Sequence, residues 1–137
     1  MPDSLQLNSL IQQLRLSGIS DSLESRLRQA KDSELPYEEL LSMLLQDELD
    51  SRDHSSLQRR ISQARFEEVK TFEGFDLKRY ALKIRHAIID LMTGKFIKEK
   101  NHIIIMGPVG TGKTHLSQAL GMLACQRGQK VKFIRSN

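Results

Sequence analysis

The segment that most constrains this chain is the octapeptide Gly-Pro-Val-Gly-Thr-Gly-Lys-Thr at residues 107–114. It has the G-x-x-x-x-G-K-T spacing of a phosphate-binding loop, whose setting is a strand before it and a helix after it. The run at 102–106 is short and β-branched, as in a strand buried on both faces. Apolar residues at helical spacing follow the loop, Gly128 stops that helix, and 130–134 is typical of a second strand. The sequence therefore predicts one β-α-β unit with a right-handed crossover.

The residue types of the loop suit nucleotide phosphates. Its glycines permit backbone angles that a side chain forbids, and they let N–H groups approach an anion closely. Lys113 is expected to reach the β- and γ-phosphates, at the positive end of the following helix, and the Thr114 hydroxyl to ligate magnesium. The expected cofactors are ATP and Mg²⁺, and the predicted nucleotide-binding residues are Gly107, Pro108, Val109, Gly110, Thr111, Gly112, Lys113 and Thr114.

Acidic residues are missing after the loop. Only 23 residues follow Thr114, and none is Asp or Glu. A P-loop ATPase uses downstream acidic groups to hold magnesium and position water. We therefore assign no catalytic residue and expect this chain to bind ATP without appreciable turnover, so ATPase activity is an expectation for a full-length protein only.

The first half of the chain is predicted to be helical. Between Ile19 and Glu73 there is no glycine and a single proline, Pro36. One amphipathic helix is expected to end before Gly18, and a second to run from Ile19 with Asp21 and Glu24 at capping-box spacing. A third begins at Pro36, and the polar stretch 50–56 bends or interrupts it before the pattern resumes up to Phe66. A linker at 67–76 and a fourth helix follow, the latter with one apolar face of Leu77, Ala81, Ile84, Ile88 and Leu91.

Two surfaces of this helical region have more than one interpretation. The apolar face from Tyr37 to Leu49 either closes a small bundle or pairs with a copy of the chain or a partner. A set of basic residues is either a solvated helix face or a contact for the phosphate backbone of DNA, and it comprises Arg52, Arg59, Arg60, Arg65 and Lys70. Arg79, Lys83 and His86, expected along one face of the fourth helix, have the same two interpretations.

The remaining composition favours a cytoplasmic protein. No apolar run approaches 18 residues and the N-terminus has no secretory pattern, so neither a membrane span nor a signal peptide is expected. The single Cys125 excludes an internal disulfide, fits a reducing compartment and is expected to be buried. The four histidines are too scattered for a metal site, and His115 is expected to pack at the helix start rather than to sense nucleotide.

Beyond the loop itself, several segments carry a family resemblance. The stretch 104–116 (IIMGPVGTGKTHL) is similar to the P-loop of IstB-like proteins, AAA+ ATPases that help bacterial insertion sequences to transpose and that are related to DnaC-type helicase loaders. Segments 14–23, 48–52 and 59–66 resemble the helices of that family, and 70–76 (KTFEGFD) resembles its entry into the ATPase core.

The resemblance implies an organisation and a function. Residues 1–70 would form a helical domain for assembly and DNA contact, and residues 71–137 would begin an α/β AAA+ core, truncated after its second strand. Such a protein would bind ATP, assemble on DNA as a homo-oligomer and recruit or activate a transposase. Phe72 and Phe75 would lie near the adenine side. The family's acidic strand, sensor and arginine finger would lie beyond residue 137, and the two strands present would not be neighbours in the sheet.

Two other functions compete with this one. One is a replicative helicase loader of the DnaC type, an ATPase whose partner would be a helicase rather than a transposase. A non-catalytic helical module, for dimerisation or DNA binding, would carry a vestigial P-loop. A small-molecule P-loop kinase fits less well, because such enzymes usually place the loop near the start of the chain.

Overall fold

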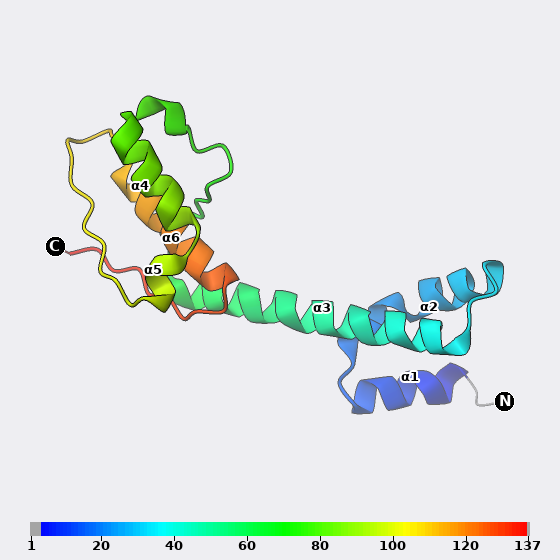
Figure 1. The fold of residues 1–137 in the computed structure, drawn as a ribbon. Coiled ribbons are helices and arrows are strands. Elements are labelled where there is room, and N and C mark those ends of the chain that lie inside the picture. The colour runs from blue at the N-terminus through cyan, green and yellow to red at the C-terminus, as the bar shows by residue number, and fades with distance from the viewer. Residues whose placement is uncertain (1–3, 137) are drawn as a thin grey trace. The chain divides into compact units, whose positions relative to one another are not determined.

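In the computed structural model, which describes residues 4–136, all regular structure is helical (Figure 1). The chain divides into two compact units, one reaching to Ser56 and the other beginning at Leu57. This division lies inside a helix. The predicted domain division after residue 70 stays a prediction.

The first unit contains α1 (Ser4–Gln13), α2 (Ser17–Asp32) and the first part of α3 (Tyr37–Ala64). Its apolar core is small and is formed by Ile11, Ile19, Leu23 and Leu44, with Leu16 and Leu40 packed against them. The three helices bury these side chains because the apolar residues recur at three- and four-residue spacing.

The start of α2 differs from the prediction. Gly18 lies inside α2 and is buried, rather than separating two helices. A Cβ at Gly18 would lie 2.7 Å from the Asp47 carbonyl oxygen and 2.7 Å from the Ser51 Cβ. The glycine thus lets α2 approach the backbone of α3 closely. The expected capping box at Asp21 is wrong, because the helix has already begun at Ser17.

A buried carboxylate and an ion pair join α2 to α3. The Glu48 side chain is 5% exposed and accepts a hydrogen bond from the Ile19 N–H (3.1 Å), while Arg52 donates to its other oxygen (3.0 Å). Arg26 on α2 donates two hydrogen bonds of 2.8 Å to the carboxylate of Asp47. Such two-pronged pairing holds both side chains in one geometry, so these contacts fix the register of the two helices.

Helix α3 is continuous through the polar stretch 50–56. No glycine or proline interrupts it, and the polar side chains remain largely exposed, so nothing breaks the helix there. The apolar face from Tyr37 to Leu49 was expected either to close a small bundle or to pair with a copy or a partner, and its leucines are of both kinds. Leu40 and Leu44 face the core, whereas Leu41, Leu45 and Leu49 are more than half exposed.

The second unit contains the end of α3, a 3₁₀ turn η1 (Leu77–Arg79), α4 (Leu82–Met92), α5 (Lys95–Lys98) and α6 (Lys113–Gln126). Helix α4 packs beside α6 (Figure 1). The core is centred on Ile88, Leu116 and Leu120. The prediction of a single fourth helix from Leu77 is wrong: Asp76 caps η1 through the Lys78 N–H (3.0 Å), Tyr80 is extended, and α4 begins only at Leu82.

The two predicted strands, 102–106 and 130–134, are not strands in the described structure. A strand is defined by the ladder of hydrogen bonds that it makes with a neighbouring strand. These two segments do not pair with each other, and among residues 4–136 there is no third segment that pairs with either of them. Phe133 instead donates a backbone hydrogen bond to the last residue of α3, Ala64 (2.7 Å). The predicted helix between them is confirmed as α6.

Candidate functional site

The loop 107–114 has a conformation that depends on its glycines. Gly110 has φ +82° and Gly112 has φ +86°, both in the left-handed region that side chains disfavour. Gly112 is also the N-cap residue of α6, which begins at Lys113. The chain therefore turns sharply into the helix at this point, as a phosphate-binding loop does.

The polar side chains of the loop fold back onto its own backbone. The Lys113 ammonium donates to the carbonyl oxygens of Gly107 (2.6 Å) and Pro108 (2.7 Å). The Thr111 hydroxyl donates to the same Pro108 carbonyl (2.7 Å). The ammonium thus lies against the carbonyl groups at the start of the loop, and a phosphate oxygen could replace one of these carbonyls as its acceptor.

The N-terminus of α6 provides backbone N–H donors in addition to the Lys113 ammonium. The first hydrogen bond of the helix runs from the Leu116 N–H to the Gly112 carbonyl (2.9 Å). The N–H groups of Lys113, Thr114 and His115 therefore have no acceptor within the helix, and the helix dipole makes this end positive. Thr114 is exposed, so its hydroxyl is accessible to a metal ion.

These donors fit the triphosphate of ATP. The loop carries an ammonium and, at the start of α6, N–H groups without an acceptor in the helix, and a cavity of about 300 Å³ adjoins it. Its other wall comes from Arg79, Tyr80, Ile84 and Ile88. Thr114 would be a single protein ligand for Mg²⁺, which suits an ion that keeps waters and phosphate oxygens as its other ligands. The described residues contain no cluster of three or more His, Cys, Asp or Glu side chains able to hold a metal by themselves.

An aromatic cluster supports the loop from the preceding segment. Phe75 stacks on Tyr80 (ring centroids 5.8 Å apart, planes at 12°) and meets the His115 ring edge-on at 5.0 Å. The His115 Nε2 lies 2.9 Å from the Thr71 carbonyl oxygen, so His115 packs at the helix start as predicted. The Tyr80 hydroxyl donates to the Thr111 carbonyl (2.7 Å). Sequence reasoning missed Tyr80, since nothing in the spacing of a tyrosine 27 residues before the loop signals this contact.

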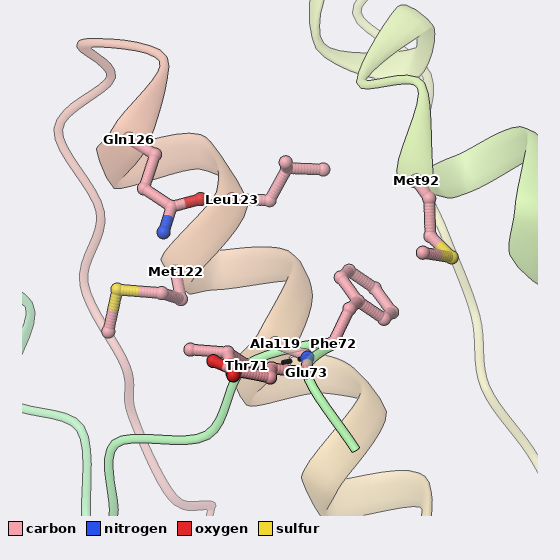
Figure 2. Close-up of a pocket in the computed structure, with 8 residues that line it drawn as sticks. All are labelled: Thr71, Phe72, Glu73, Met92, Ala119, Met122, Leu123 and Gln126. Atoms are coloured by element: carbon pink, nitrogen blue, oxygen red, sulfur yellow. Dashed lines mark hydrogen bonds between the residues drawn. The ribbon is translucent and has the colours of Figure 1, made fainter. Parts of the chain in front are cut away.

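A second cavity lies on another face of α6 and is shown in Figure 2. Helix α6 lines it with Ala119, Met122, Leu123 and Gln126, the segment 71–73 faces them, and Met92 comes from the end of α4. Glu73 is its only ionisable lining residue.

Three of the basic residues interpreted as either a solvated helix face or a DNA contact have partners within the chain. Arg52 bonds to Glu48, Arg60 donates to the Cys125 carbonyl oxygen (2.9 Å), and Lys70 pairs with Glu68 (2.9 Å).

The thiol of Cys125 is fully buried, which confirms the expectation that it is buried, and burial raises its pKa. No helix in residues 4–136 combines the length and apolar character that crossing a membrane takes.

Comparison with known proteins gives one consistent family. Residues 9–137 match the sequence profile of the IstB-like ATP binding protein family. A Mycobacterium tuberculosis protein named for ATP binding in an insertion sequence is 35% identical over 96% of this chain and 52% of its own length. A Pseudomonas aeruginosa protein named for ATP binding in insertion sequence IS21 is 37% identical over 94% of this chain and 49% of its own length. The chain spans about half the length of these curated relatives.

Proposed function

Because this chain belongs to the IstB-like ATP binding protein family, we propose that it binds ATP through the loop 107–114 and serves the transposition of an insertion sequence. The observation that carries this proposal is the Lys113 ammonium, held 2.6 Å and 2.7 Å from two loop carbonyls at the positive end of α6. Lys113 and the loop N–H groups would hold the phosphates of ATP, and the Thr114 hydroxyl would be a ligand for Mg²⁺.

A nucleotide titration tests this proposal. Binding of a fluorescent ATP analogue with Mg²⁺ is measured for the 137-residue chain, for Lys113→Ala and for Lys31→Ala, an exposed lysine on α2 that serves as the matched control. Hydrogen bonds to charged groups contribute about 1.5–3 kcal/mol, so Lys113→Ala should raise Kd roughly 10- to 100-fold. Equal affinities for the two variants would refute the proposal, and absence of binding by the unsubstituted chain would favour a vestigial loop.

We also propose that 102–106 and 130–134 are strands of an AAA+ core in a chain of the relatives' length. The supporting observation is apolar exposure: Ile104 and Met106 are 82% and 86% exposed, and Ile134 is 72% exposed. Exposing apolar side chains to water costs about 25 cal/mol of free energy per Å² of apolar surface. Neighbouring strands would cover them. This proposal includes a helical assembly domain over 1–70 and a core from residue 71.

The wider role in transposition is proposed from the relatives. Their names place them in insertion sequences, which favours a transposase over a replicative helicase as the client. We propose ATP-dependent assembly on DNA, ATP hydrolysis and transposase recruitment for a protein of their length, located in the cytoplasm. The exposed row Leu41, Leu45 and Leu49 would pair with a second copy. Sedimentation of the chain with and without a Leu45→Glu substitution tests this pairing. The pairing is excluded if the two chains sediment with the same molecular mass.

A further inference from the structure

We propose that Tyr80, together with its neighbour Arg79, is a positioning residue of the phosphate-binding loop and sets the direction of two loop N–H groups. This inference rests on the proposed binding of ATP at the same loop. Neither residue belongs to the G-x-x-x-x-G-K-T motif: Arg79 is the last residue of η1, and Tyr80 follows it before α4.

The contacts are made to consecutive carbonyl groups of the loop. The Tyr80 hydroxyl donates to the Thr111 carbonyl at 2.7 Å, and Arg79 Nη2 donates to the Gly110 carbonyl at 3.3 Å. In a planar trans peptide, the carbonyl and the following N–H point in opposite directions. Holding these two carbonyls toward the 79–80 segment therefore directs the N–H groups of Thr111 and Gly112 away from it.

Tyr80 is itself held in place from two sides. Its ring stacks on Phe75 at 5.8 Å with the planes at 12°. Its backbone is extended (φ −106°, ψ 148°), and its carbonyl accepts a hydrogen bond from Arg85 on α4 (3.2 Å). The position of the Tyr80 hydroxyl is therefore set by contacts outside the loop.

Gly112 is shaped to this contact. A Cβ built on Gly112 would lie 2.7 Å from the Tyr80 hydroxyl oxygen. Real side chains do not approach that closely, so the absence of a side chain at 112 lets the hydroxyl reach the Thr111 carbonyl. Gly112 therefore serves the loop twice, through its left-handed backbone and through the space that it leaves for Tyr80.

The test compares two tyrosine-to-phenylalanine substitutions in the full 137-residue chain. Tyr80→Phe removes the hydroxyl and keeps the ring on Phe75, while Tyr37→Phe, on the chain's only other tyrosine, is the matched control. A single neutral hydrogen bond corresponds to a change in Kd of roughly 3- to 10-fold. We expect Tyr80→Phe to weaken binding of the ATP analogue by that factor, without a loss of thermal stability that would explain it, and Tyr37→Phe to leave Kd unchanged.

A spectroscopic readout on the nucleotide-free chain separates this inference from the proposed function. The ¹³C shift of the Thr111 carbonyl and the ¹H–¹⁵N shift of Gly112 respond to the hydrogen bond at that carbonyl and to the geometry of the peptide unit. We expect both to change in Tyr80→Phe and to stay fixed in Tyr37→Phe. If the unsubstituted chain binds no nucleotide, the proposed function fails. The positioning inference is overturned if these shifts are the same with and without the Tyr80 hydroxyl, or if Tyr80→Phe binds ATP as tightly as the unsubstituted chain.

Discussion

Replacing Gly18 with alanine should destabilise the first unit, although alanine is the better helix former. At this position a Cβ would lie 2.7 Å from the Asp47 carbonyl oxygen, 2.7 Å from the Ser51 Cβ and 2.8 Å from the Glu48 Cα. Two of these three atoms belong to the backbone of α3, so they cannot move aside as a flexible side chain would. The methyl group must therefore push α2 away from α3.

The expected size of the effect follows from two opposing terms. Overpacking of this kind costs about 1–3 kcal/mol. Alanine recovers up to about 1 kcal/mol of helix propensity, and less than that near a helix end. The net destabilisation should be about 1–2 kcal/mol, which corresponds to a fall in Tm of roughly 5–15 °C for a unit of this size. Separation of the helices should also lengthen the 3.1 Å bond from the Ile19 N–H to Glu48.

The assay combines urea unfolding, followed by circular dichroism, with hydrogen exchange of the Ile19 amide. Ser20→Ala, an exposed substitution two residues along the same helix, is the control and should change the free energy of unfolding by no more than about 0.5 kcal/mol. A Gly18→Ala variant as stable as the unsubstituted chain, with the Ile19 amide equally protected, would refute the close helix contact.

Two further predictions concern ionisation and reactivity. Hydrogen bonding from Arg26 lowers the pKa of Asp47 to about 2, so the stability from this pair should be complete above the unfolded value near 3.8 and be lost as the pH falls toward 2. Asp47→Asn should flatten that acid limb in urea titrations between pH 2 and 5; an unchanged slope would contradict the pairing. The thiol of Cys125 is fully buried with a raised pKa, so a thiol reagent should modify it far more slowly in the folded chain than in denaturant, and equal rates would show that α6 is not packed as described.

The helices were predictable where the apolar period was uninterrupted. The helix after the loop, α6, follows the prediction from Lys113 to Gln126 because Leu116, Leu120 and Leu123 repeat at helical spacing and Gly128 follows. The short α5 was not predicted, since four residues are too few to show a period.

The buried carboxylate of Glu48 has a recognisable sequence pattern. It lies four residues after the core residue Leu44 and four before Arg52, so an acid occupies an apolar position of α3 with a cation one turn away. Although desolvation raises the pKa of Glu48, hydrogen bonds from the Ile19 N–H and Arg52 outweigh it, and the net pKa is lowered. An acidic residue in an apolar row is a sign of such a partner.

The sequence alone determined the local chemistry of the loop. The order of glycines, Lys113 and Thr114 dictates which backbone angles are possible and which donors stand at the start of α6, because these are properties of residues near one another in the chain. Tertiary structure decided the contacts between residues that are distant in the chain: the Tyr80 hydroxyl on Thr111, the approach of α2 to α3 at Gly18, and the lack of a strand at 102–106. A strand, a close helix contact and a side chain that orients a distant peptide all require partners far along the chain, and local sequence patterns do not encode which partners those are.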